Sequence, residues 1–360
     1  MKNADYADEK PTRLLAYSLT RCHSGVTLIE VLAAILILSI ICITLARFSR
    51  YAFETWWTSS TKLAMQQEGR EVLYWLNQDM KGARFSSIGT IFLNTGFEQP
   101  YSKNESPESW DALPDGITRI GPSDPGGASN PQIKSGFYSC AVSTSGVYYS
   151  SAFSTITVAG NYYFTGFVKT SSTDTVAEMS IWNQTSELKS LSSSTTYWVY
   201  KSTTILFGSG DILRIRLKNS KQGLVSYFDD VSLIPQNLIL SESYSSNYYG
   251  CFKNNPDTGN IIEFETYITT DIASGSWGGW QRYRFRYDPV QKYLYREYRV
   301  GSDWAKAPGL NPVAENVKSL NLLLVAGYIN ISVETEKILP GRGNEKKSYT
   351  LQTRIYPMLP

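Results

Sequence analysis

VTLIEVLAAILILSIICITLA, residues 26–46, is the stretch of sequence that decides how this chain is organised. It holds 21 residues and a single charge, Glu30. As a helix rising about 1.5 Å per residue it would be about 30 Å long, which matches the hydrocarbon core of a bilayer. Lys10, Arg13 and Arg21 precede it. Because basic residues favour the cytoplasmic side, we expect one transmembrane helix whose N-terminus is cytoplasmic, with the rest of the chain outside the cytoplasm.

The residues in front of this helix differ from an ordinary secretory signal peptide. In such a peptide, a short apolar segment comes before a cleavage site of small residues. Here the small residue, Gly25, comes before the apolar segment. Cleavage beside Gly25 would leave the helix in the mature chain, so residues 1–25 are predicted to be a leader and residues 26–46 the membrane part of the N-terminal helix.

The hexapeptide GVTLIE at residues 25–30 resembles the class III signal of type IV pilins and type II secretion pseudopilins. The resemblance implies cleavage after Gly25 by a prepilin peptidase and N-methylation of Val26. It also implies an inner-membrane assembly platform and other pilins or pseudopilins as partners. The first mature residue of this family is usually phenylalanine, where this chain has Val26.

Glu30 is the fifth residue after the predicted cleavage site. A carboxylate in hydrocarbon is costly unless it is paired, so an acid inside a membrane segment is a functional hypothesis by default. In the family its partner is the N-terminal amine of the neighbouring subunit, which implies that Glu30 sets the register of assembly. The alternative is a simple membrane anchor in which the glutamate has no role.

The composition excludes several classes of protein. Of the 360 residues, 42% are hydrophobic, 13% aromatic and 18% charged, which is typical of a folded chain. The net charge of +2, from 34 basic and 32 acidic residues, gives no polybasic surface, so no nucleic-acid partner is expected. The single histidine, His23, lies in the predicted leader. Without it, catalytic triads and imidazole metal sites are unavailable, and an enzyme would have to use carboxylates.

Residues 47–90 are predicted to continue the helix as an amphipathic stem. Proline is absent between Pro11 and Pro100, and apolar residues recur at helical spacing at Val72, Leu73, Leu76, Met80 and Ala83. The other side of this helix is expected to be a solvated face and a source of subunit contacts; it carries Glu68, Arg70, Glu71, Gln78 and Asp79.

From residue 91 onward the composition changes to Ser, Thr, Tyr and Gly, with short alternating runs between turn residues. The clearest strand is Ile212–Lys218, in which Leu213, Ile215 and Leu217 face one way and the basic residues between them the other. Many short strands at this spacing indicate a β-sandwich.

Residues 91–237 resemble the jelly-roll carbohydrate-binding modules that accompany xylanases and related enzymes, a galactose-binding-like fold. The resemblance rests on motifs in the family's order: NTGFE at 94–98, Trp110, GFY at 136–138, YYFTGFVK at 162–169, YW at 197–198 and YFDDVSL at 227–233. It implies an inserted all-β sandwich with a potential to bind glycan.

Residues 238–360 are predicted to form an antiparallel pilin-type β-sheet. Asp288-Pro289 starts a turn between two of its strands, which predicts a hairpin. The string YRFRYDP at 283–289, followed by Leu294-Tyr295-Arg296, resembles the sheet of the J-type minor pseudopilins of type II secretion and related minor pilins. The fold class is therefore α+β, with a long membrane and stem helix, a pilin sheet and an inserted jelly roll.

Jelly rolls of this kind commonly hold a structural calcium ion between an early acid and the closing acids. The resemblance therefore points to Glu98, Asp229 and Asp230 as ligands, and carboxylate oxygens are what calcium prefers. Because side chains alternate along a strand, only one of Asp229 and Asp230 is expected to be a direct ligand. The alternative is a solvent-exposed acidic pair without a metal ion.

A glycan surface needs an exposed aromatic plane with hydrogen-bonding neighbours. Alternation in the sequence directs Trp182 and Gln184 away from a core that holds Met179 and Ile181. The same argument directs Phe167 and Lys169 away from the core side of their strand. We therefore expect one sheet face to carry carbohydrate-binding residues, namely Trp182, Gln184, Phe167 and Lys169. The competing candidates are Tyr148 and Tyr149, while Trp110 and Trp198 are interpreted as packing.

Cys140 and Cys251 are the two cysteines of the region expected to be exported. An extracytoplasmic location permits a disulfide bond between them, which would join the insert to the C-terminal sheet. Two free buried thiols are the alternative.

The favoured function is a minor pilin or pseudopilin of a type IV pilus-like or type II secretion filament, with a jelly roll that binds glycan for adhesion or substrate recognition. A jelly roll that serves as a protein-docking or spacer module is the second hypothesis. A membrane-anchored glycan hydrolase is the third, and it requires two carboxylates about 5 to 10 Å apart in a cleft.

Overall fold

The computed structural model describes residues 27–90, 92, 97, 110, 115–121, 131–132, 134, 139–146, 148–242, 248–249, 260–268, 279–300, 303–309, 311–325, 328–339 and 345–357. Gly25, Val26, Glu98 and Cys251 lie outside these residues. The chain divides into two compact units, Met1–Trp57 and Thr58–Pro360.

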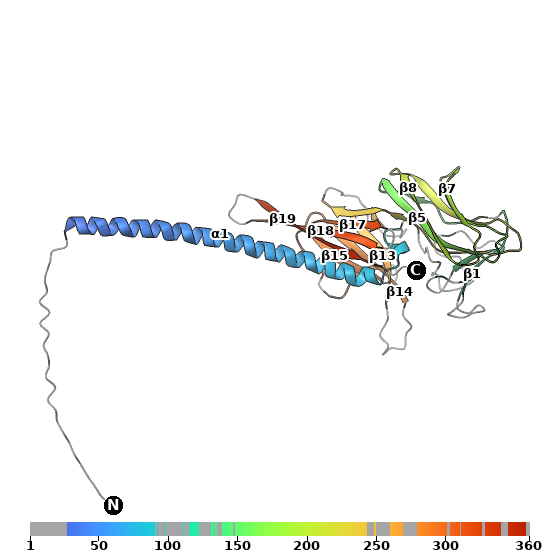
Figure 1. The fold of residues 1–360 in the computed structure, drawn as a ribbon, viewed down its shortest axis with the longest axis horizontal. Coiled ribbons are helices and arrows are strands. Elements are labelled where there is room, and N and C mark those ends of the chain that lie inside the picture. Colours follow the sequence, from blue (N-terminus) through green and yellow to red (C-terminus); the bar gives the residue numbers. More distant parts are fainter. Residues whose placement is uncertain are drawn as a thin grey trace, which may run out of the picture. The chain divides into compact units, whose positions relative to one another are not determined.

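A single long helix, α1, runs from Leu28 to Lys81 (Figure 1). Its first part is long and apolar enough to cross a membrane, with a mean hydropathy of 2.8 in its most apolar 18-residue window. The Thr27 N–H donates to Glu30 Oε2 at 2.9 Å, and the Glu30 N–H donates to Thr27 Oγ1 at 3.4 Å. This reciprocal pair is a capping box, which satisfies main-chain donors that the first helical turn leaves without partners.

A short 3-10 helix, η1, follows at Phe85–Ser87. The described strands are β1 Ile117–Ile120, β2 Ser139–Val142, β3 Tyr148–Ser150, β4 Ser154–Thr155, β5 Gly160–Thr170, β6 Ala177–Trp182, β7 Glu187–Ser193, β8 Val199–Phe207, β9 Ile212–Asn219, β10 Ser226–Pro235, β11 Asn237–Ser241, β12 Tyr248–Tyr249, β13 Asn260–Ile268, β14 Gly279–Asp288, β15 Tyr293–Val300, β16 Asp303–Lys306, β17 Val317–Val325, β18 Tyr328–Ile338 and β19 Lys346–Ile355. The fold class is α+β, as the sequence predicts.

The strands after residue 236 form two sheets in place of the one sheet expected. The β18 sheet has the order β11-β17-β18-β19, and the β14 sheet has the order β12-β13-β14-β15-β16. The hairpin predicted at Asp288-Pro289 is confirmed, because β14 and β15 pair antiparallel with Asp288 opposite Tyr293.

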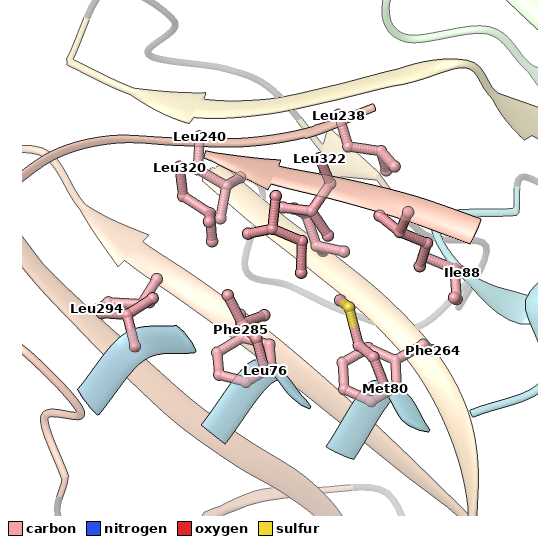
Figure 2. Packing of buried hydrophobic residues seen from close by; sticks show 14 of the residues in the cluster. Leu76, Met80, Ile88, Leu238, Leu240, Phe264, Phe285, Leu294, Leu320 and Leu322 are labelled. Atoms are coloured by element: carbon pink, nitrogen blue, oxygen red, sulfur yellow. The ribbon is translucent and has the colours of Figure 1, made fainter. Parts of the chain in front are cut away.

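The apolar stripe of α1 is buried in one core with both of these sheets. Val72, Leu76, Met80 and Ala83 are fully buried, and Leu73 packs at the edge of the cluster, so the helical spacing in the sequence predicted this face correctly. Figure 2 shows Leu76 and Met80 of the helix beside aromatic side chains of the β14 sheet, with leucines of β11 and β17 on the other side of the core. The stripe is wholly apolar because side chains from both sheets bury it.

Asp79 is a correction to the predicted solvated face of the stem. It is only 4% exposed, and the guanidinium of Arg296 on β15 donates to both carboxylate oxygens at 2.6 Å. The same guanidinium lies 4.5 Å from the ring of Trp75, which directly precedes the buried Leu76 in the sequence. The pair holds the helix against β15, since a buried carboxylate needs a close cationic partner.

The end of α1 is set by pairing with a strand. After Lys81 the chain leaves the helix, Ala83 forms a bridge with Thr266 of β13, and the Arg84 N–H donates to the Glu265 carbonyl at 3.0 Å. The main chain therefore exchanges helical hydrogen bonds for sheet hydrogen bonds at this point. The helix ends before residue 90, where the sequence placed the end of the stem.

Strands β1 to β10 form the predicted sandwich. The β10 sheet has the order β1-β2-β10-β5-β8, and the β9 sheet has the order β3-β9-β6-β7, with β4 paired to β9. Leu213, Ile215 and Leu217 are buried between the sheets together with Met179 and Ile181, as the alternation in the sequence predicted.

Asp79→Asn tests the contact between α1 and β15. We expect the free energy of unfolding to fall by about 3 to 5 kcal/mol, because the substitution leaves the Arg296 guanidinium buried without a carboxylate. Urea denaturation of the full chain in detergent, followed by tryptophan fluorescence, measures the change. Gln78→Asn at the exposed neighbouring position is the control, and equal stability of the two variants would contradict the assignment.

Candidate functional site

Asp229 and Asp230 lie where β10 leaves its regular register. The pairing of β10 with β5 shifts between Asp229 and Ser232, and Asp230 has a positive φ of 49°. Asp230 Oδ1 lies 3.2 Å from Arg84 Nη1 and accepts a hydrogen bond from Ser86 Oγ at 3.2 Å. Both partners belong to the segment that follows α1, so this buried ion pair joins the stem to the jelly roll.

This arrangement bears on the predicted calcium site. Asp230 does not suit calcium, because a guanidinium already occupies the place of the cation beside its carboxylate. Asp229 accepts hydrogen bonds from the main-chain N–H groups of Asp230 and Lys134, at 2.8 and 3.1 Å. Within the described part of the chain, acids and cysteines do not gather in any group of three. Glu98 lies outside that part, so a calcium ion on Glu98 and Asp229 stays a prediction.

Cys140 lies on β2 inside the sandwich and is fully buried. Burial raises the pKa of its thiol, because the apolar surroundings disfavour the thiolate. Its predicted disulfide partner, Cys251, is outside the described residues, so the pairing stays a prediction.

Phe167 and Lys169 lie on the outer face of the β10 sheet. The Phe167 ring is 5.2 Å from that of Tyr200, and Lys134 Nζ lies 5.1 Å above it. Lys169 Nζ donates to the Pro131 carbonyl at 2.8 Å, and desolvation lowers its pKa. Phe167 is only 8% exposed, so little of its ring is open to a ligand.

Trp182 lies elsewhere, on the outer face of the β9 sheet. Its Nε1 donates to Ser180 Oγ at 2.9 Å, and its ring is 6.1 Å from the ring of Tyr148 in an edge-to-face arrangement. Gln184 is in the exposed turn after β6, which is closed by hydrogen bonds from Thr185 and Ser186 to Asn183 Oδ1.

The expectation that Trp182 and Phe167 share one sheet face is wrong. They lie on consecutive strands, β6 and β5, but these strands belong to opposite sheets of the sandwich. Alternation along a strand predicts which side of the strand faces the core, and it holds for both residues. It does not predict which sheet the strand joins, because that depends on how the connection crosses the sandwich.

Of the two competing tyrosines, Tyr148 is on this surface and Tyr149 is in the core. Tyr149 is fully buried and stacks on Trp110 at 5.1 Å, which confirms the packing role of Trp110. Tyr148 is 36% exposed.

Three basic residues complete the surface around Trp182, and none of them was predicted as a binding residue. Arg214, Arg216 and Lys218 alternate along β9 on the side away from the core. Arg216 lies 4.0 Å from the Trp182 ring and 5.2 Å from the Tyr148 ring, and Lys218 lies 5.5 Å from the Tyr148 ring. Their outward direction was visible in the sequence, but the aromatic rings that meet them come from two other strands. Arg214 lies 4.8 Å from the ring of Phe153, in the loop between β3 and β4. We call Tyr148, Phe153, Trp182, Arg214, Arg216 and Lys218 the arginine–aromatic face.

Comparison with known protein families finds one match. Residues 20–46 match the prokaryotic N-terminal methylation motif, which includes Gly25, Val26 and Glu30. The chain thus carries a prepilin-type signal at the start of α1. No curated protein matches this chain.

Solved structures that resemble this chain include carbohydrate-binding modules. TmCBM61, solved with β-1,4-galactotriose, has a TM-score of 0.29 and 16% identity and covers 41% of this chain and 98% of its own. A CBM6 module of Cellvibrio mixtus lichenase 5A, solved with cellotriose, has a TM-score of 0.24 and 13% identity, with 33% of this chain and 86% of its own covered. A cyclase from Fischerella sp. TAU has a TM-score of 0.29 and 18% identity, with 39% of this chain and 94% of its own covered. Likenesses this low say nothing about ligand or activity.

Asp230→Asn tests the role of the ion pair with Arg84. We expect the free energy of unfolding to fall by about 3 to 5 kcal/mol, because the buried guanidinium loses its carboxylate. The loss should be the same in EDTA and in excess calcium, as measured by denaturation with the wild-type chain in parallel. A loss seen only in calcium would instead make Asp230 a metal ligand.

Proposed function

We propose that this chain is a minor pilin or pseudopilin subunit of an extracytoplasmic filament, of the type IV pilus or type II secretion kind. The methylation motif at residues 20–46 supports this function, and α1 supplies the apolar helix that such a subunit needs. Before assembly the chain would be anchored in the membrane by α1, with the later residues outside the cytoplasm. Its partners would be the prepilin peptidase, the inner-membrane assembly platform and other pilins or pseudopilins.

The jelly roll is proposed to bind glycan for adhesion or substrate recognition. The observation that carries this proposal is the arginine–aromatic face, where Tyr148 and Trp182 lie beside hydrogen-bonding groups on an outer sheet surface. Aromatic planes with a few placed polar groups are what sugar rings require. A face used only for packing would need another element to cover it, yet Tyr148 and Phe153 are 36% and 42% exposed.

A protein-docking or spacer role for the jelly roll is the second candidate. Aromatic and arginine side chains are also enriched where proteins bind each other, so the same face supports this alternative. In both cases the proposed subunit has a structural role without catalysis. Cleavage of a glycan by the purified chain would overturn that part of the proposal.

Gly25→Val tests the processing of the chain. We expect the leader to stay attached, because the bulky side chain replaces the small residue in front of the proposed cleavage site. Intact-mass measurement of the chain from its host membrane should then show the unprocessed and unmethylated form. Ser24→Ala is the control and should be processed normally, while normal processing of Gly25→Val would contradict the proposal.

Trp182→Ala tests the glycan surface. In a glycan array probed with the full chain in detergent, we expect the affinity for any bound glycan to fall by about tenfold or more, which corresponds to about 1.4 kcal/mol. Tyr197→Ala removes an aromatic ring that is 68% exposed on the same jelly roll but outside the arginine–aromatic face, so it should not change binding. A folded wild-type chain that binds no glycan would favour the docking or spacer role.

A further inference from the structure

Arg214 and Arg216 occupy the centre of the arginine–aromatic face. Both are half-buried on β9, and each lies over an aromatic ring. The Arg214 guanidinium carbon is 4.8 Å from the Phe153 ring centre, and that of Arg216 is 4.0 Å from the Trp182 ring centre. Stacking of this kind orients a guanidinium and leaves its N–H edge available for other groups.

Neither arginine has an acidic partner among the described residues. No ion pair joins them to a described carboxylate, and the buried Nε atoms of both lack a hydrogen-bond acceptor. Across the sheet, Arg214 faces Trp182, while Arg216 faces Ser180 and Ser150. A charged donor that is partly desolvated without an acceptor is costly, which makes this arrangement unusual for a purely structural role.

Arginines in the C-terminal region provide an internal comparison. Arg284 stacks on Trp304 at 4.3 Å and pairs with Glu297, and Arg286 stacks on Tyr295 at 4.4 Å and pairs with the same glutamate at 3.1 Å. Arg296 stacks on Trp75 and pairs with Asp79 at 2.6 Å. In these cases the protein supplies both a ring and a carboxylate, whereas for Arg214 and Arg216 the part of the chain that the structure describes supplies only the ring.

Two glutamates lie at the margins of the face. Glu178 is opposite Lys218, and Glu187 is opposite Trp182 on the edge strand β7. Neither forms an ion pair with the two arginines in the described structure. Glu178 lies next to Lys218 rather than next to Arg214 or Arg216, so among the described residues the arginines are the cations of this face that lack a neighbouring acid.

The position of Arg216 also limits how much of the Trp182 ring a sugar can contact. With a guanidinium 4.0 Å from its centre, the indole ring is partly covered by Arg216. A sugar that reaches this place would therefore meet guanidinium N–H groups as well as an aromatic surface. Guanidinium groups recognise carboxylate and sulfate oxygens through paired, charge-assisted hydrogen bonds.

We propose that the arginine–aromatic face binds an acidic glycan, whose carboxylate or sulfate groups accept hydrogen bonds from Arg214 and Arg216, which have no acidic partner among the described residues. This inference rests on the proposed glycan-binding function and names the class of glycan. Tyr148 and Trp182 contact the sugar rings and hold Arg216 in place, while Phe153 holds Arg214. The acid groups of the glycan pair with Arg214 and Arg216 in the way that Glu297 and Asp79 pair with arginines of the C-terminal region.

The first experiment varies the ligand and needs no variant of the protein. The full chain in detergent is titrated with an oligogalacturonate, its methyl ester, a neutral galacto-oligosaccharide and a sulfated galactan fragment of similar length. We expect the oligogalacturonate or the sulfated fragment to bind at least about tenfold more tightly than the ester and the neutral sugar. Comparison of the two acidic ligands distinguishes carboxylate from sulfate, and the acidic binding should weaken as salt rises.

The second experiment varies the protein. The double substitution Arg214→Gln and Arg216→Gln should reduce binding of the acidic ligand to the level of its methyl ester. Arg216→Lys keeps the charge but loses the planar donor pair, so it should also weaken acidic binding. Arg354→Gln is the matched control, because Arg354 also stacks on a tyrosine, Tyr328 at 4.8 Å, but lies on β19 outside the face. Near-ultraviolet circular dichroism verifies that each variant is folded.

Each other outcome counts against a specific part of the argument. Equal binding of acidic and neutral glycans, both lost in Trp182→Ala, would overturn the acidic-glycan inference and leave the glycan-binding function standing. Equal binding of single-stranded DNA and the acidic glycans would mean recognition of polyanions in general, and would also overturn it. Binding of no glycan in any arm would overturn both proposals together.

Discussion

The arrangement of the C-terminal region depends on burying the apolar stripe of α1 together with Asp79. Val72, Leu76 and Met80 of this helix are fully buried by side chains from both C-terminal sheets. Asp79 lies directly beside this stripe, so the helix cannot be covered without a partner for its carboxylate. Arg296 provides that partner from β15, with both carboxylate oxygens at 2.6 Å. Apolar burial thus supplies most of the stabilisation, and the ion pair fixes which part of the β14 sheet lies next to the helix.

The jelly roll enters and leaves the chain at neighbouring points of this framework. It begins after α1 and η1, and it ends where β10 runs directly into β11. Near the entry, Arg84 and Ser86 bind Asp230, and Thr90 Oγ1 donates to the Leu233 carbonyl at 3.3 Å. Because the two ends of the insert are tied together, an additional domain can be carried here with little disturbance of the helix and sheets around it.

The arginines of β14 and the arginines of β9 have different partners. In the β14 sheet, Arg284 and Arg286 share Glu297, so their charges are compensated inside the protein. Arg282 and Arg284, which alternate along β14, are buried and paired with acids from β13 and β15. On β9 the same alternation lies on an outer face, where the guanidinium groups of Arg214 and Arg216 lie over aromatic rings and form no ion pair with a described carboxylate. The sequence pattern is the same in both strands, and the neighbouring strands decide whether the arginines are buried with acids or lie over rings on an outer face.

The sequence alone was sufficient for features that depend on neighbours along the chain. The apolar run at residues 26–46 predicted the start of a long helix, and alternation in β9 predicted which side of that strand is buried. The Asp288-Pro289 turn predicted its hairpin, because a turn and its two strands are close in sequence.

Tertiary structure decided the features that join distant segments. Asp79 and Arg296 are separated by 217 residues, and Ser86 and Asp230 by 144, so no local pattern could identify either pair. The separation of Phe167 from Trp182 has the same origin, since the sheet that each strand joins depends on its pairing partners. Periodicity in the sequence shows which side of a strand or helix faces the core. Which strands pair with each other depends on contacts between segments far apart in the sequence, so it is decided only when the whole chain folds.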